Sequence, residues 1–243
     1  MNHRSLTLVV HGESGAGKSW LADTTPAPRL VFDVEGGARF TKSKKIKWDP
    51  RNPPPEVNGE WDTTVITTID LDDVRRAFQW LVEGKHPFKS VVMDSLSEAQ
   101  KRSVDKLAGT GQLTMQHYGV LLREGDALVR SFRDLTLHPT NPVDVVMFVC
   151  GSREKGQEHP VLRPALLGQM AEQIGYTVDV MAYLKMDVDA EGKLMTRAQF
   201  IQIDNIAAKD RTGKLGVRMD DPSIPKMLEM IYGAAPAAEE AKV

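Results

Sequence analysis

Residues 9–21, VVHGESGAGKSWL, give the clearest indication of the fold. The stretch runs from an apolar segment through a glycine-rich turn into the start of a helical pattern, and GESGAGKS at 12–19 fits the phosphate-loop pattern G-x-x-x-x-G-K-[ST]. The glycines let backbone N–H groups surround an anion, and the helix adds the positive end of its dipole. The sequence therefore predicts a nucleotide-phosphate site between a buried strand and a helix.

The motif assigns roles to its own residues. Lys18 is placed to reach the β- and γ-phosphates of a nucleotide, and the Ser19 hydroxyl to bind Mg²⁺. The predicted cofactors are therefore ATP and Mg²⁺. The predicted nucleotide-binding residues are Gly12, Glu13, Ser14, Gly15, Ala16, Gly17, Lys18, Ser19 and Trp20.

The bulk composition is that of an ordinary globular protein. The chain is 41% hydrophobic and 26% charged, and its 243 residues are enough for one large α/β domain or two small ones. The net charge of −2 argues against a generally basic nucleic-acid-binding surface. A single cysteine, Cys150, excludes an intrachain disulfide and indicates a reducing compartment. The N-terminal apolar run is too short for a signal peptide or membrane span, so we expect a cytoplasmic protein without membrane contact.

Apolar runs and helical patterns alternate along the chain. Strands are expected at 6–11, 29–35, 63–69, 88–94 and 143–150, and helices at 18–23, 70–82, from 95 onward and at 118–137. Two further runs at 177–186 and 197–203 have antiparallel character, and a terminal helix follows. The predicted fold is α/β with a mainly parallel sheet and an antiparallel edge extension, in one domain over 1–232. Residues 41–62, 103–117 and 151–164 are predicted as loops, and 233–243 as a disordered tail.

An acidic residue at the end of a buried strand is the expected partner of the Mg²⁺ site. SVVMD supplies Asp94 in that position. The alternative is that Asp94 only caps the next helix. Ser95 already fits that role, with Glu98 completing an S-x-x-E capping box, so the metal role is favoured for Asp94.

The residue that activates water is less clearly marked. Many P-loop ATPases place Glu directly after the strand-end Asp, but Ser95 stands there, and Glu98 is engaged by the capping box. Glu35, at the end of VFDVEGG, is the other candidate. If the second strand lies beside the first, Glu35 faces the γ-phosphate and accepts a proton from water. From the local sequence alone it is equally an exposed turn carboxylate.

The order of these segments resembles that of the RecA-like ATPases over most of the chain. VFDVEGG is similar to their strand that ends in the catalytic glutamate, which implies that Glu35 is the base. IDNIAAKDRTGKL, residues 203–215, resembles the Lys-x-Arg-x-Gly element of RadA- and DnaB-type proteins. That resemblance implies that Lys209 and Arg211 reach the γ-phosphate of a neighbouring subunit. Without it, the segment reads as a solvated basic turn.

Among RecA-like proteins, the chain looks most like the short phage-encoded proteins of single-strand annealing and recombination. This resemblance implies a homo-oligomer with ATP between subunits, single-stranded DNA as a partner, and a single-strand DNA-binding protein as a further candidate partner. One departure concerns the polar sensor, usually Gln, that ends the fifth strand in this family. Here the strand ends Cys150-Gly151-Ser152, and Ser152 is the candidate substitute.

The same resemblance places DNA against the loops at 103–117 and 151–164. The second of these segments and the basic cluster at 42–51 each read equally well as a solvated charged loop. The candidate DNA-binding residues are Arg153, Lys155, Arg163, Lys44 and Lys45.

Two other functions remain compatible with the motifs. A small-molecule or nucleotide kinase would need an acceptor pocket and an arginine-bearing lid, and gives no reason for AKDRTG. A non-hydrolytic, ATP-gated assembly or loading factor would use the nucleotide only to control partner binding.

Overall fold

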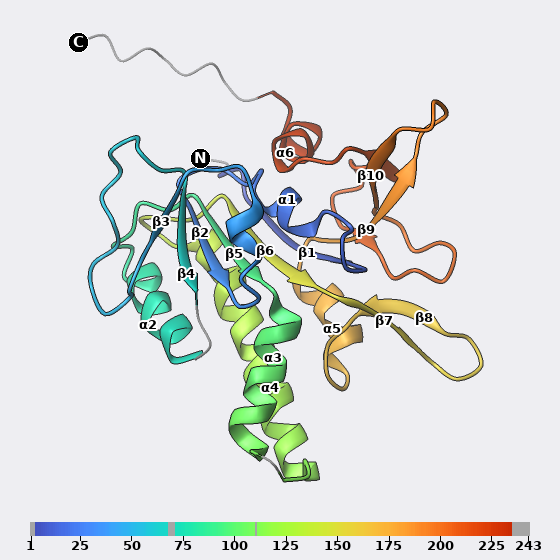
Figure 1. Ribbon diagram of the computed structural model, residues 1–243, viewed down its shortest axis with the longest axis horizontal. Coiled ribbons are helices and arrows are strands. Elements are labelled where there is room, and N and C mark those ends of the chain that lie inside the picture. Colours follow the sequence, from blue (N-terminus) through green and yellow to red (C-terminus); the bar gives the residue numbers. More distant parts are fainter. Residues whose placement is uncertain (1–2, 68–70, 110, 235–243) are drawn as a thin grey trace.

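The computed structural model describes residues 3–67, 71–109 and 111–234. Within them the chain builds a ten-stranded sheet in the order β12-β10-β9-β1-β6-β5-β2-β4-β3, with β11 paired to β9 (Figure 1). Its strands are β1 Leu6–Gly12, β2 Arg29–Asp33, β3 Lys45–Lys47, β4 Thr63–Thr67, β5 Ser90–Asp94, β6 Val145–Cys150, β9 Val180–Val188, β10 Leu194–Gln199, β11 Lys209–Asp210 and β12 Arg218–Asp220.

Helices lie between several of the strands. They are α1 Lys18–Ala22, α2 Leu71–Val82, α3 Leu96–Ala108, α4 Met115–Asp134, α5 Met170–Thr177 and α6 Ile224–Tyr232, with short 3-10 turns η1 Gly37–Phe40 and η2 Leu135–Leu137. A separate two-stranded hairpin, β7 Ser152–Lys155 and β8 Val161–Pro164, projects from the body, as does the α3–α4 pair (Figure 1).

The strand directions confirm the predicted fold class. Strands β1 to β6 and β9 pair in parallel, whereas β10, β11 and β12 join by antiparallel pairing at the β9 side. Parallel neighbours require crossover connections; α3 and α4 supply the one between β5 and β6, whereas β3 and β4 are joined by residues 48–62 without a helix. The fold is therefore α/β, with a mainly parallel sheet and an antiparallel extension.

Alternate residues of the central strands face opposite sides of the sheet. Val9 and Phe148 pack into one apolar core, and Val10 and Val149 into the other. Helices α2, α3, α4 and α5 cover the first core, and α1 and α6 cover the second (Figure 1). Burial on both faces explains why these strands read as continuous apolar runs in the sequence.

The prediction that 41–62 is only a loop is wrong at three residues. Lys45–Lys47 form β3, which pairs in parallel with β4 at the edge of the sheet. Trp48 and Trp61 are buried and anchor the segment to the first core. The lysines concealed the strand from a pattern search, because an edge strand tolerates charged side chains that remain in water.

The prediction of a loop at 103–117 is wrong at both ends. Helix α3 continues to Ala108, where Gly109 ends it with φ 56°. Helix α4 begins after Thr114, whose side chain accepts a hydrogen bond from the backbone N–H of His117. The glycine that ends α3 and the threonine that caps α4 therefore leave only a short connection between the two helices.

The predicted loop at 151–164 is instead the β7–β8 hairpin, in which Arg153 pairs with Arg163. Helix α2 is amphipathic, since Val74, Ala77 and Leu81 are buried on the side that faces the first core. Asp70, the first residue of the helix expected at 70–82, lies outside the described residues, as does most of the predicted tail. No helix in the described parts of the chain is long and apolar enough to cross a bilayer.

Phe148 provides a test of this packing. It is fully buried in β6, at the centre of the sheet, so Phe148→Ala should lower the free energy of unfolding by about 3–5 kcal/mol in urea titrations. Phe40→Ala is the control, because that ring is 67% exposed and its loss should change the value by less than about 0.5 kcal/mol. Equal effects of the two changes would contradict the described core.

Candidate nucleotide-binding site

The phosphate loop follows β1 directly, and its glycines meet different constraints. A Cβ on Gly12 would lie 2.3 Å from the carbonyl oxygen of Leu184 in the neighbouring β9. Gly15 and Gly17 have φ of 80° and 85°, in the region where side chains are strained. The loop therefore requires glycine at 12 for close packing, and at 15 and 17 for its turns.

Lys18 begins α1 and folds back over the loop. Its Nζ donates to the carbonyl oxygens of Gly12 at 2.9 Å and Glu13 at 2.6 Å. Burial lowers the pKa of Lys18, and the nearby carboxylates of Asp94 and Glu35 oppose that change. The ammonium group is thus held at the loop by two neutral carbonyl groups. A negatively charged phosphate can replace them, because a hydrogen bond between two charged groups is stronger.

Asp94 ends β5 opposite the loop. Burial raises the pKa of its carboxyl to about 6, and a hydrogen bond with the Ser19 side chain acts in the opposite direction. Ser19 and Asp94, the two residues predicted to form the Mg²⁺ site, are therefore already together. Their hydroxyl and carboxylate oxygens are the donors that Mg²⁺ prefers, so this pair fits the ion.

A cavity of about 550 Å³ joins these groups. It is lined by all the predicted nucleotide-binding residues, by Glu35, and by residues the sequence reading did not select; those additional residues are Gly37, Phe40, Thr41, Ser95, Val149 and Gly151. Ser152, the candidate sensor, also lines it. Of the additional residues, only Ser95, Thr41 and Phe40 carry side chains able to bond or stack, and their spacing follows no phosphate-loop motif.

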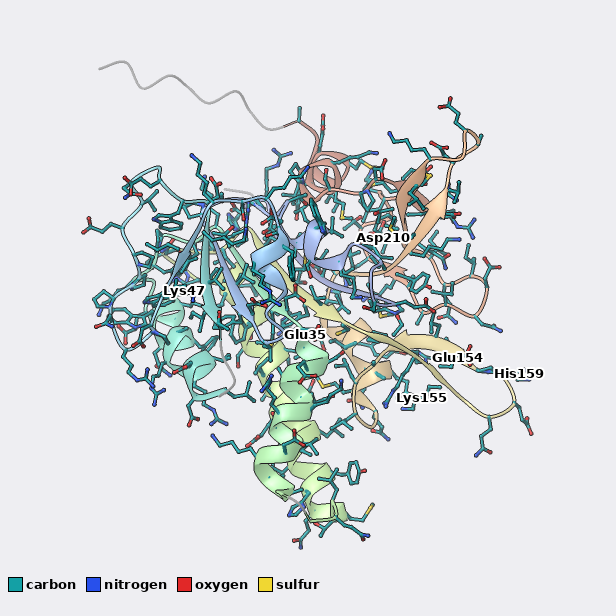
Figure 2. All side chains as sticks on the ribbon, viewed as in Figure 1. Glu35, Lys47, Glu154, Lys155, His159 and Asp210 are labelled. Atoms are coloured by element: carbon teal, nitrogen blue, oxygen red, sulfur yellow. The ribbon has the colours of Figure 1, made fainter. Side chains whose placement is uncertain are left out.

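Glu35 is exposed and lines this cavity, but the expectation that the second strand lies beside the first is wrong. Strand β2 does not lie beside β1, because β5 and β6 stand between them. Glu35 still reaches the cavity because parallel strands bring their carboxyl ends to one edge (Figure 2). The Ser95 hydroxyl donates to Glu35 Oε1 and also accepts from the backbone N–H of Glu98.

The other half of the predicted capping box does not form as expected. The carboxylate of Glu98 pairs with Lys101 at 3.3 Å and Arg102 at 3.7 Å. Ser95 alone therefore caps α3. This leaves the hydroxyl hydrogen of Ser95 for Glu35, a contact that the local sequence could not reveal.

The two acidic residues of VFDVEGG have different surroundings. Asp33 is buried and accepts from the backbone N–H groups of Gly37 at 2.9 Å and Ala38 at 3.2 Å. Burial raises the pKa of Asp33, and these hydrogen bonds oppose the rise. Asp33 thus holds the η1 turn, whereas Glu35 is directed to the cavity.

Lys209 and Arg211 do not approach the phosphate loop of their own chain. Lys209 pairs with Met181 and Met181 with Val9, three residues before Gly12. Lys209 Nζ donates to the carbonyl oxygens of Gly175 and Val178, at the end of α5. Burial lowers the pKa of Lys209.

Arg211 donates to the backbone of Tyr176 at 3.0 Å and pairs with Asp179 at 3.2 Å. Within its own chain the basic pair therefore stabilises the helix C-terminus. A role in a neighbour's site stays a prediction.

The candidate DNA-binding residues lie in two separate places. Figure 2 shows Lys47 of the basic cluster at one side of the molecule and Lys155 with His159 at the other. Three of the five candidates are engaged by backbone carbonyls: Arg153 by Leu166, Lys155 by Gly168, and Lys45 by Thr41 and Ser43. Lys44 is exposed and Arg163 partly buried. DNA binding by these residues stays a prediction.

Two exposed aromatic rings stand at the rim of the cavity. Trp20 is 50% exposed and Phe40 67% exposed. Lys42 Nζ lies 5.3 Å from the Trp20 ring, and the Arg39 guanidinium 4.7 Å from Phe40. The rim thus combines aromatic rings with positive charges, which suits contact with a nucleobase, a phosphate or another protein surface.

The burial of Asp94 has a measurable consequence for the metal-free protein. Because its folded-state pKa of about 6 lies above the ordinary 3.8, the charged carboxyl destabilises the fold. The protonated carboxyl does not carry this penalty, so the fold is more stable below pH 4 and loses that stability as the pH rises through 6. Asp94→Asn should therefore raise the free energy of unfolding by roughly 1–3 kcal/mol at pH 7.5 with EDTA present, and by almost nothing at pH 4.

Urea titrations at the two pH values measure this difference. Glu191→Gln, at an exposed turn, is the matched control and should be neutral at both. A lower stability of Asp94→Asn at pH 7.5 would contradict the described surroundings of Asp94.

Solved structures similar to this chain include an ATPase of the type III secretion system of pathogenic bacteria (12% identity, TM-score 0.48, covering 86% of this chain and 58% of that one). A second is the flagellar accessory protein FlaH of Methanocaldococcus jannaschii, with 10% identity and a TM-score of 0.36 over 80% of this chain and 76% of that one. A third is the genome packaging NTPase B204 of Sulfolobus turreted icosahedral virus 2, in complex with ATP-gammaS, with 10% identity and a TM-score of 0.39 over 79% of each chain. The chain thus spans 58% of the length of the first. No curated protein matches.

The family comparison covers most of the chain. A family model described as an AAA domain matches residues 4–212, which include the phosphate loop, Glu35, Asp94 and Lys209 with Arg211. This chain belongs to that AAA-domain family and is a nucleotide-binding P-loop domain of the ATPase type.

Proposed function

We propose that this protein hydrolyses Mg²⁺-bound ATP at the cavity beside its phosphate loop. The observation that carries the proposal is the meeting of four groups at one cavity: the Lys18 ammonium, the Ser19 hydroxyl and the carboxylates of Asp94 and Glu35. They stand at the start of α1, just after β2 and at the end of β5, and they have the charges that phosphoryl transfer to water requires.

The bound phosphates would be held by the loop. Its backbone N–H groups and Lys18 stabilise the negative oxygens, and Ser19 with Asp94 would hold Mg²⁺. The ion, when bound, neutralises part of the charge that develops on the transferred group. Lys18 gives up its two carbonyl partners as the phosphates enter.

Glu35 is the proposed base. One carboxylate oxygen accepts from Ser95, which fixes the side chain and leaves the other oxygen for a water in the cavity. A carboxylate in that position accepts the proton that water loses as it attacks. Ser95 is therefore a positioning residue for the base.

We further propose a homo-oligomer with ATP between subunits. The exposed Trp20 and Phe40 at the rim support this, because exposed aromatic side chains are enriched on surfaces that another protein covers. Arg211, about half exposed, is the stronger candidate for the residue that acts on the neighbour's phosphates. Lys209 is the weaker candidate, since two carbonyls already bind it.

The proposed role of the oligomer is in annealing or recombination of single-stranded DNA, as in the phage-encoded proteins that the sequence resembles. Support comes from the resemblance and from the exposed lysines around Lys44. Binding through such residues would be independent of sequence and would weaken as salt rises.

Phosphate release from ATP tests the central proposal. Glu35→Gln should lower kcat by about 100-fold or more while the Kd for ATP changes less than about threefold, since only proton transfer is removed. Glu191→Gln should behave as the wild type. Release at the wild-type rate by Glu35→Gln would contradict the base assignment.

The same assay separates the alternatives. Stimulation by single-stranded DNA, lost at high salt, supports the DNA proposal. ATP consumption only when a small-molecule acceptor is added, without free phosphate, would indicate a kinase. Tight ATP binding without turnover, with or without DNA, would indicate an ATP-gated assembly factor.

Mixed oligomers test the action of Arg211 in trans. Arg211→Ala has an intact loop and Lys18→Ala an intact arginine, so each alone should be inactive. Mixing them should restore activity at the sites that combine both intact halves. Absence of recovery, with both variants folded and assembled, would show that Arg211 acts only through its contacts with α5.

A further inference from the structure

His11 is a buried polar residue that the phosphate site does not itself contain. It is the residue before Gly12, is 0% exposed, and does not line the cavity. Its Nε2 lies 2.7 Å from the carbonyl oxygen of Ala207, and its Nδ1 lies 2.8 Å from the Ser152 Oγ. The imidazole thus joins the strand before the phosphate loop to two segments distant in sequence.

The protons of this chain of contacts are determined by its ends. A backbone carbonyl only accepts, so Nε2 carries a hydrogen. Burial lowers the pKa of His11 to about 4, with the charges of Lys18 and Arg163 contributing in the same direction. The ring is therefore neutral at physiological pH, its Nδ1 is an acceptor, and the Ser152 hydroxyl donates to it.

This arrangement fixes what Ser152 can offer to the cavity that it lines. Its only hydrogen is directed at His11, so its oxygen presents lone pairs to the cavity side. An acceptor of this kind cannot bond to a phosphate oxygen that carries no hydrogen, but it can accept from water. Turning the hydroxyl to a phosphate would leave the buried Nδ1 without a partner, which is unfavourable.

We propose that His11 is a positioning residue that orients the Ser152 hydroxyl as a second hydrogen-bond acceptor for the attacking water. Ser152 then does not donate a hydrogen bond to the phosphate, as a polar sensor would. This inference rests on the proposed hydrolysis. Water that donates one hydrogen to Glu35 and the other to Ser152 has its lone pair free for the phosphorus atom. As the new oxygen–phosphorus bond forms, the bond from the γ-phosphorus to the bridging oxygen breaks and that oxygen leaves with ADP; the proton lost by the water passes to Glu35, and Ser152 keeps its own.

The contact also relates the cavity to the rest of the chain. Ala207 donates its backbone N–H to Leu162 of β8 at 2.9 Å, and β11 with Lys209 begins two residues later. A shift of the 205–211 segment would therefore move the acceptor of His11 Nε2. Through His11 it would change the direction of the Ser152 hydroxyl without contact with the nucleotide.

Steady-state kinetics with paired variants tests the proposal. Ser152→Ala and His11→Phe should each lower kcat about 10-fold while the KM for ATP changes less than about twofold, because they disturb the water and not the phosphates. Ser152→Thr keeps the hydroxyl, and His11→Gln keeps one donor and one acceptor, so both should retain most of the activity. The double variant Ser152→Ala/His11→Phe should be no slower than either single variant.

The outcomes distinguish this inference from the proposed function. Absence of hydrolysis by the wild type would overturn the function itself. A wild type that hydrolyses ATP with a Glu35→Gln defect, together with a normal kcat for Ser152→Ala, would overturn only the inference. A purely structural role of His11 predicts lower thermal stability of His11→Phe but a normal kcat for its folded fraction.

A second measurement is independent of the variants. Nitrogen-15 NMR of the wild-type protein, compared with His11→Gln to assign the signal, reports which ring nitrogen carries hydrogen. We expect hydrogen on Nε2 and none on Nδ1 at pH 7. Hydrogen on Nδ1 would reverse the direction of the Ser152 hydroxyl and overturn the proposal.

Discussion

The register of the parallel strands is the constraint on which the candidate site depends. Asp33 pairs with Asp94, Asp94 with Val149, and Val149 with Val10. The hydrogen bonds of this ladder hold the carboxyl ends of four strands level, so the segments that follow them open onto one cavity. A slip of one residue between β5 and its neighbours would turn Asp94 to the opposite face of the sheet. The chemistry of the site is thus set by backbone pairing before any side chain contributes.

The parts of the site that the sequence predicts are those encoded over a few consecutive residues. The phosphate loop needs glycines, Lys18 and Ser19 at fixed spacing, and Asp94 needs only a buried strand and a cap in the next position. The alternating fold class follows similarly, because strands buried on both faces are continuously apolar. Each of these patterns has a local physical cause, and the structure contains each of them.

What the sequence leaves open depends on contacts between distant segments. The order of strands decides that β5 and β6 separate β1 from β2, and no local pattern carries that information. Strand β3 lacks apolar alternation because one of its edges is solvent-exposed. The partners of Glu35 and His11 are 60 and 141 or more residues away. Ser95 and Ser152 therefore read as ordinary polar residues until the fold brings them to the cavity.

The close approach of Gly12 to Leu184 has a consequence for how this motif varies between related chains. The adjacent strand backbone requires the first glycine of the loop, whether or not a phosphate is bound. A chain that lost nucleotide binding in the course of evolution, while keeping this sheet, would remain under selection for glycine at position 12. Lys18 and Ser19 would be free to drift. In such chains a glycine at position 12 would indicate the fold, whereas the lysine and the serine would indicate nucleotide binding.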